Sequence, residues 1–273
     1  MNLKIKVSDF DLSSTLDSGQ VFGFEKNNSG YQGIVRGEKV ILVQSGSRLM
    51  VSGQFRSNFR KELHDFFDLD YDLKKVLWVI DGEESFGASV QTIRGLRLIH
   101  QDSWEALACF IISSNNNVKR IQGIWKNLTK RLSSKPDCFP SVADIARSHE
   151  RILRELGLGY RAPFLYRAAS FLSHNPKCLE VICEAPYQEA KRRLLAFPGI
   201  GEKVADCALL YGFRKLEAFP VDIWILRVMR KLFFKNKPVS EDRIRSFGQK
   251  RWGELAGYVQ QYLFHGARMG LIQ

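Results

Sequence analysis

The chain has 273 residues, of which 45% are hydrophobic, with five scattered cysteines and a formal net charge of +12 at pH 7. This composition predicts a globular protein with a substantial core, and the basic balance favours a polyanionic partner without distinguishing DNA from RNA. The first residues lack a signal-peptide core, and no stretch approaches the roughly 20 apolar residues of a membrane span. The cysteine spacing matches no metal motif. We therefore expect an intracellular protein without membrane span or metal.

The N-terminal part reads as short strands. Between residues 20 and 53, β-rich segments alternate with turn residues in VFGFEK, NNSG, YQGIVRG, EKVILVQ, SGS and RLMVSG, which predicts an antiparallel meander. From Phe55 onward the spacing becomes helical, and we expect the largest helical stretch to begin near residue 97. The chain is therefore predicted to be α+β, with a small N-terminal α/β domain over residues 1–95 and an all-helical domain over residues 96–273.

Three apolar stripes support the helical part. Their members recur at i, i+3, i+4 and i+7, which places each stripe on one helix face that points at a core. The stripes are Trp104, Leu107, Ala108, Ile111 and Ile112; Ile225, Val228, Met229, Leu232 and Phe233; and Leu255, Tyr258, Val259, Tyr262 and Leu263.

A glycine-rich turn separates two helical segments in LAFPGIGEKVA, residues 195–205. Pro198, Gly199 and Gly201 break the helix, so the chain must reverse within a few residues. The glycines let a ligand approach closely, and the N–H groups that open the second helix point outward with its positive dipole end. This pattern predicts a helix-hairpin-helix near residues 190–212 that grips a phosphate, although it also fits a simple turn.

Two charged side chains near this turn suggest chemistry. Lys203 lies in the first turn of the second helix, where the positive helix end favours a neutral amine over an ammonium. A neutral amine can attack a sugar carbon and form a Schiff base, while the alternatives are a solvated charge or a phosphate contact. Asp222 precedes the next amphipathic helix and is predicted to be its N-cap, which would keep the carboxylate ionised. Such a carboxylate could stabilise positive charge at C1′ or accept a proton from Lys203.

Four motifs in order resemble the helix-hairpin-helix base-excision superfamily, and most closely its 8-oxoguanine DNA glycosylases. They are LDSGQVFGF; GLRLIHQDSWEALACFIISSNNNVKRI; LGLGYRA; and FPGIGEKVADC together with FPVDIW. The resemblance covers most of the chain. It implies a bifunctional glycosylase and AP lyase that removes 8-oxoguanine opposite cytosine from double-stranded DNA, works without a cofactor and acts as a monomer.

The resemblance also implies which residues form the site. It makes Lys203 the nucleophile and Asp222 the essential carboxylate. The other implied positions are Gly19, Cys207, Gln260 and Phe264 around the flipped base; Asn115, Arg120, Tyr160 and Arg161 at the orphaned cytosine and the gap in the stack; and Gly199, Gly201 and Val204 as backbone donors to phosphates. The carbonyl of Gly19 would accept the N7 proton that 8-oxoguanine has and guanine lacks.

Two positions depart from the family pattern. Trp224 stands where the well-studied eukaryotic members carry histidine, and Ala267 stands where they carry aspartate. Both positions affect phosphate contact and pocket shape, and hence how strictly the site selects 8-oxoguanine over other bases. Two other functions stay open: a glycosylase that uses water to remove other damaged purines, against which Lys203 argues, and a helix-hairpin-helix protein that binds DNA without catalysis.

Overall fold

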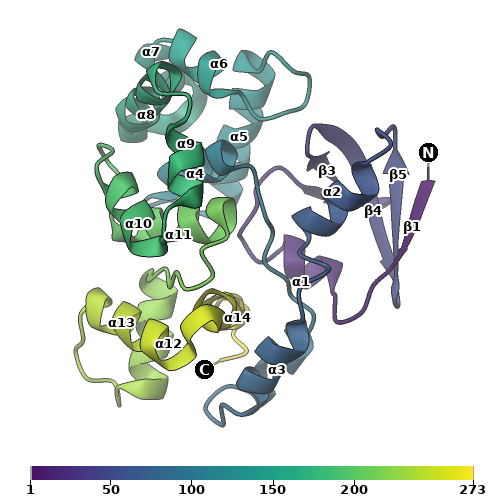
Figure 1. The fold of residues 1–273 in the computed structure, drawn as a ribbon, viewed down its shortest axis with the longest axis vertical. Coiled ribbons are helices and arrows are strands. Elements are labelled where there is room, and N and C mark those ends of the chain that lie inside the picture. The colour runs from purple at the N-terminus through teal and green to yellow at the C-terminus, as the bar shows by residue number, and fades with distance from the viewer. Residues whose placement is uncertain (1, 273) are drawn as a thin grey trace.

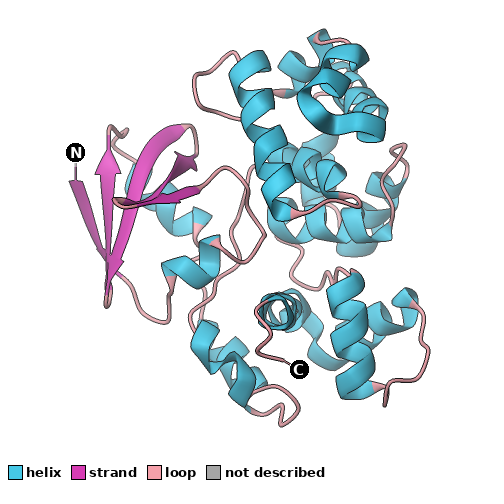
Figure 2. Ribbon diagram, turned by 180° about the vertical axis from the view of Figure 1, so that it is seen from behind, coloured by secondary structure: helices cyan, strands magenta, loops and turns pink. Residues whose placement is uncertain are grey.

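The computed structural model describes residues 2–272, and a five-stranded antiparallel sheet forms one side of it (Figures 1 and 2). The strands are Asn2–Lys6 (β1), Glu25–Asn27 (β2), Gly30–Val35 (β3), Glu38–Ser45 (β4) and Arg48–Gly53 (β5), in the order β1-β5-β4-β3-β2. Strands β2 to β5 form the predicted meander, although only the end of VFGFEK is extended. The sequence-based prediction lacks β1, because its pairing with β5 joins residues far apart in the chain and leaves no local signal.

Helices make up most of the rest and confirm the predicted α+β class. They are α1 (Leu12–Leu16), α2 (Phe59–Phe66), α3 (Leu73–Asp81), α4 (Ser103–Ser113), α5 (Val118–Leu132), α6 (Val142–Arg147), α7 (Glu150–Leu153), α8 (Ala162–His174), α9 (Cys178–Glu184), α10 (Tyr187–Leu195), α11 (Glu202–Phe213), α12 (Ile223–Phe233), α13 (Glu241–Trp252) and α14 (Ala256–Arg268). Short turns of 3-10 or π geometry are η1 (Ala88–Ile93), η2 (Arg154–Leu158), η3 (Gly159–Arg161) and η4 (Gly253–Leu255). Within residues 2–272, no helix combines the length and the apolar character that crossing a membrane requires.

The helix expected to begin near residue 97 begins instead at Ser103 as α4. Asp102 fixes this start, because its carboxylate accepts two backbone hydrogen bonds of the first turn, each at 3.0 Å. The predicted stripe from Trp104 to Ile112 is buried, but so are Cys109 and Phe110 outside it. Helices α5, α8 and α11 pack around α4, which is therefore a central helix. The longest helix is α5, with 15 residues.

Two hydrophobic cores lie inside this architecture. The first lies between the sheet and helices α1 and α2, and the second fills the helical part. Helix α3 contributes Leu73, Val76, Leu77 and Ile80 to the second core. In Figure 1, α3 lies beside α14 and away from the sheet. The domain boundary near residue 95 stays a prediction, because residues 73–93 precede it yet pack with the helical core.

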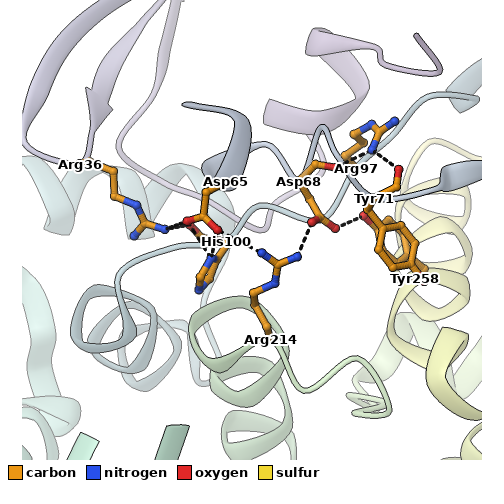
Figure 3. A network of polar contacts seen from close by, with 8 residues as sticks. All are labelled: Arg36, Asp65, Asp68, Tyr71, Arg97, His100, Arg214 and Tyr258. Carbon is orange, nitrogen blue, oxygen red and sulfur yellow. Dashed lines mark hydrogen bonds and ion pairs between the residues drawn. The ribbon is translucent and has the colours of Figure 1, made fainter. Parts of the chain in front are cut away.

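A polar network joins the N-terminal layer to the helical part (Figure 3). Asp68, which is buried just after α2, accepts hydrogen bonds from Arg214 and, at 2.7 Å, from the hydroxyl of Tyr258. Arg214 also pairs with Asp65 at 3.1 Å, and Asp65 in turn lies 3.0 Å from the ring nitrogen of His100. Arg214 ends α11 and Tyr258 belongs to α14, so the network fixes both helices against α2.

Candidate active site

A cavity of about 450 Å³ lies where the N-terminal layer meets the helical part. Its walls come from the turn after α1, the end of α4 with the following loop, the first turns of α11 and α12, and helix α14. The residues predicted for catalysis and base binding all line it, namely Gly19, Lys203, Cys207, Asp222, Gln260 and Phe264. The fold thus brings residues from both ends of the chain to one cavity.

Lys203 is the second residue of α11 and is half-buried. Its Nζ donates a hydrogen bond to the Oγ of Ser113 at 3.1 Å and lies 5.5 Å from the centre of the Phe110 ring. Both partners belong to the central helix α4, so the position of the amine depends on how α11 packs against α4. Asp222 lines the same cavity, but the hydrogen-bond partner of Nζ in this structure is Ser113.

Asp222 is the N-cap of α12, as the sequence predicts. Its Oδ1 accepts a hydrogen bond from the backbone N–H of Ile225 at 2.9 Å. Burial raises the pKa of the Asp222 carboxyl above its ordinary value, and the backbone donors and the charge of Lys203 oppose this rise without cancelling it. Burial therefore opposes the effect of the cap, and the ionised state of the Asp222 carboxylate stays a prediction.

Gln260 and Cys207 offer two different surfaces to the cavity. Gln260 is buried, and its Nε2 donates to the carbonyl of Pro220 at 3.1 Å. Its Oε1 is also buried and has no hydrogen-bond partner among the described residues, so it is free to accept from a ligand. Burial raises the pKa of the Cys207 thiol to about 12 although the charge of Lys203 opposes the rise. Cys207 therefore presents a neutral, polarisable thiol at neutral pH.

Gly19 is held in a tight turn by residues that the sequence analysis did not single out. Its φ of +83° favours glycine. Gln20 is buried and hydrogen-bonds through its amide to the backbone of residues 97–99, at 2.8 and 2.7 Å. From α14, Gln261 donates to the carbonyl of Ser18 at 3.3 Å. The glycine is therefore fixed from both the N-terminal layer and the helical part.

The residues predicted to fill the gap in the DNA stack lie on the loop after α4, on α5 and on η3. Tyr160 is 49% exposed, and its hydroxyl donates to the Ser114 carbonyl at 3.1 Å and accepts from Asn115 at 3.3 Å. Arg120 is exposed on α5. Arg161 is buried instead, lies 4.4 Å from the centre of the Tyr160 ring, and donates to the carbonyls of Ser114 and Asn115. Its guanidinium therefore holds the loop that carries Asn115.

The helix-hairpin-helix lies between α10 and α11. Gly199 has φ +82°, and a β-carbon there would lie 2.2 Å from the ring of Phe164, so the turn requires glycine. Gly201 is the N-cap of α11 and offers no capping side chain. The first N–H groups of α11, including that of Val204, are therefore available to an anion at the positive end of the helix.

Several residues that line the cavity are absent from the sequence-based prediction. They are Phe22, Phe110, Ser113, Tyr211 and Arg268, while Trp224 enters it only as a departure from the family pattern. For Arg268 a signal exists, because it follows Phe264 by four residues and so shares its helix face. Across residues 2–272, no cluster of three or more His, Cys, Asp and Glu side chains is placed to hold a metal ion.

Two family models together match residues 2–254. Residues 2–107 match the 8-oxoguanine DNA glycosylase N-terminal domain, and residues 108–254 match the HhH-GPD superfamily of base excision DNA repair proteins. The probable N-glycosylase/DNA lyase of Methanothermobacter thermautotrophicus is 29% identical, with 99% of this chain and 97% of that protein aligned. The N-glycosylase/DNA lyase OGG1 of Arabidopsis thaliana is 28% identical, with 96% of this chain and 78% of that protein aligned.

A solved structure is also similar over almost the whole chain. It is that of the Clostridium acetobutylicum 8-oxoguanine glycosylase/lyase in complex with double-stranded DNA that contains cytosine opposite 8-oxoguanine. The two chains superpose with a TM-score of 0.91 at 29% sequence identity, covering 99% of this chain and 98% of the other.

Proposed function

The chain belongs to the helix-hairpin-helix base excision DNA repair superfamily and to its 8-oxoguanine glycosylase branch, and we propose that it removes 8-oxoguanine from double-stranded DNA and then cleaves the strand as an AP lyase. The observation that carries the proposal is the cavity shared by Lys203, Asp222, Gln260 and Phe264. These residues belong to one chain, so a monomer contains the complete proposed site. The charge of +12 suits DNA, and we propose that the protein acts inside the cell on duplex DNA.

In this proposal, duplex DNA binds across the hairpin and the loop after α4. The backbone N–H groups of Gly199, Gly201 and Val204 bind a phosphate, that of Val204 at the uncapped N-terminus of α11. The exposed side chains of Tyr160, Asn115 and Arg120 enter the space that the flipped nucleotide leaves. Arg161 contributes by fixing their loop, because each of its three guanidinium nitrogens donates to a backbone carbonyl.

The flipped base would lie in the cavity between the ring of Phe264 and the thiol of Cys207. The free Oε1 of Gln260 would accept from the N–H donors on the Watson–Crick edge of guanine, which would satisfy a buried acceptor. The carbonyl of Gly19 would accept the N7 proton. Ordinary guanine has no proton on N7 and would place two acceptors face to face, so the site would reject it.

Lys203 would supply the nucleophile for both chemical steps. Its neutral Nζ attacks C1′ while the glycosidic bond breaks, and the electron pair of that bond leaves with the base, which takes up a proton. The carboxylate of Asp222 stabilises the positive charge that develops at C1′. Loss of a proton from the nitrogen and opening of the sugar ring give a Schiff base. This makes the C2′ proton acidic, so its removal expels the 3′ phosphate, and water then releases the lysine.

Single-turnover excision tests the proposal. The substrates are a duplex with one 8-oxoguanine opposite cytosine and the same duplex without damage, and the proteins are wild type, Lys203→Gln and the control Lys61→Gln, which changes an exposed lysine of α2. We expect wild type and the control to release 8-oxoguanine only, and Lys203→Gln to bind the damaged duplex without releasing the base. Base release by Lys203→Gln at the wild-type rate, or no lesion preference in wild type, would overturn the proposal.

A further inference from the structure

Arg268 lines the cavity but has no role in the proposed reaction so far. It is the last residue of α14, and its guanidinium carbon lies 5.5 Å from the centre of the Phe264 ring. Its Nη2 donates to the carbonyl of Asp17 at 3.2 Å. Its Nη1 is buried and has no hydrogen-bond partner within residues 2–272. The side chain is therefore fixed at one nitrogen and has a free donor at the other.

This free donor lies directly beside the turn that holds Gly19. A β-carbon on Gly19 would lie 2.3 Å from Nη1 of Arg268 and 3.5 Å from the ring of Phe264. Arg268, Gly19 and Phe264 therefore form one continuous wall of the cavity. A group bound at this wall would therefore meet Nη1 beside the turn of Gly19.

The free donor is also unfavourable while the cavity holds no acceptor. Burial lowers the pKa of Arg268, and the charges of Asp17 and Asp222 oppose this effect without removing it. A buried donor without an acceptor costs free energy, and a ligand oxygen at this place would recover it. A hydrogen-bond acceptor of a ligand at this wall would therefore be stabilised by Nη1.

Helix geometry indicates which edge of a purine this acceptor lies on. Gln260, Phe264 and Arg268 follow one another at i, i+4 and i+8, so they lie in a row along one face of α14, about 12 Å from first to last. A purine that stacks on Phe264 with its Watson–Crick edge at Gln260 directs its imidazole edge toward Arg268. On that edge, 8-oxoguanine carries O8 next to N7.

We propose that Arg268 is a specificity-determining residue that donates a hydrogen bond from Nη1 to O8 of the flipped 8-oxoguanine. This inference rests on the proposed function, and it adds a second point at which the lesion is read. Guanine carries C–H at C8, so it would leave Nη1 buried and unpaired, and the site would disfavour it at C8 as well as at N7.

The experiment compares two lesions in single-turnover excision. One is 8-oxoguanine, and the other is 8-thioguanine, which keeps the N7 proton but replaces O8 by a weakly accepting sulfur. The proteins are wild type, Arg268→Leu and the control Arg60→Leu, because Arg60 also donates to one backbone carbonyl but lies on α2. Borohydride trapping on abasic-site DNA, which has no base to contact, is measured in parallel.

We expect Arg268→Leu to release 8-oxoguanine about 10- to 100-fold more slowly than wild type, as for loss of a hydrogen bond to a charged group. The variant should lose most of the wild-type preference for 8-oxoguanine over 8-thioguanine, while trapping on abasic DNA stays unchanged. The control should behave as wild type. An unchanged rate on 8-oxoguanine, or an equal slowing on both lesions, would overturn the role of Arg268. If instead wild type neither releases 8-oxoguanine nor is trapped, the proposed function itself fails.

Discussion

Lys203 donates a hydrogen bond from Nζ to the hydroxyl of Ser113 at 3.1 Å. The two residues come from helices that pack against each other, since Ser113 ends the central helix α4 and Lys203 lies in the first turn of α11. The hydroxyl therefore gives the proposed nucleophile a fixed resting position at the wall of the cavity.

Replacement of Ser113 by Ala should slow base excision by about 3- to 10-fold, because the loss of one hydrogen bond leaves Nζ less well positioned. The affinity for DNA and the free energy of unfolding should change little, since Ser113 is only partly buried. Single-turnover rates with an 8-oxoguanine duplex measure the effect, and Ser113→Thr, which keeps the hydroxyl, should restore most of the rate. An unchanged rate in Ser113→Ala would show that the bond does not position the amine.

The two functions of Asp222 can be separated by substitution. Asn also caps helices, so Asp222→Asn should keep the free energy of unfolding within about 0.5 kcal/mol while excision slows about 100-fold or more. Asp222→Ala should lose excision and also about 1 kcal/mol of stability. Excision rates and urea denaturation measure the two effects, and a full rate in Asp222→Asn would exclude the charge from the chemistry.

The raised pKa of Asp222 also predicts a pH dependence. If the carboxylate is the active form, excision must fall as the pH decreases, and the fall begins at a higher pH than an ordinary carboxyl would give, because burial raises the pKa of Asp222. The acidic limb of the pH–rate profile measures this. An acidic limb at or below the ordinary aspartate range would contradict the assignment.

The hairpin glycines provide a matched pair. Gly199→Ala should destabilise the fold by about 2–4 kcal/mol, because φ is +82° and the new methyl group would collide with the ring of Phe164. Gly201→Ala should be tolerated, because no atom lies within 4 Å of the position of its β-carbon. Thermal unfolding of the two variants tests this difference, and equal stability would show that the hairpin tolerates a different turn.

Glu105 should make the free energy of unfolding decrease as the pH rises, which is opposite to the effect of a carboxylate in an ion pair. Its carboxylate accepts from Trp125 Nε1 at 2.9 Å beside a second cavity of about 700 Å³, and burial raises its pKa to about 7 from 4.5. A folded-state pKa above the unfolded value means that the stability is present below pH 4.5 and is lost as the pH rises through 7.

Glu105→Gln removes this titration. The variant should therefore be about 1–2 kcal/mol more stable than wild type at pH 8, and the difference should disappear near pH 4.5. Urea denaturation at the two pH values measures the difference. The control is Glu84→Gln, which changes an exposed side chain and should show no such pH dependence. A constant difference at both pH values would contradict a raised pKa.

The sequence predicts those parts of the fold that have local signals. The meander from β2 to β5, the hairpin and the cap at Asp222 each depend on neighbouring residues, and the structure contains all three. Strand β1 has no such signal, because it forms only by pairing with β5. The start of α4 is misplaced because the segment before Asp102 is irregular, and its side chains, such as Arg97, hydrogen-bond to distant backbone carbonyls.

The site, like the fold, can be predicted from the sequence only in part. The resemblance selects six residues that line the cavity. Gly19, Lys203, Cys207 and Asp222 lie in the matched motifs, and Gln260 and Phe264 lie on one face of the last helix. Their supports also lie in the motifs, but no local spacing predicts their contacts: Ser113 meets Lys203 only through the packing of two helices, and Gln20 anchors the turn through residues 97–99. The buried state of Arg161 and the raised pKa of Asp222 depend on the environment around each side chain, which spacing alone does not give.

The central claim is that the amine of Lys203 bonds covalently to the sugar of a damaged nucleotide. The most direct test is borohydride reduction during the reaction with an 8-oxoguanine duplex, followed by protease digestion and mass spectrometry of the DNA-linked peptide. We predict a single adduct at Lys203, and none with Lys203→Gln. Release of the base without any trapped adduct, or an adduct on a different lysine, would contradict the account.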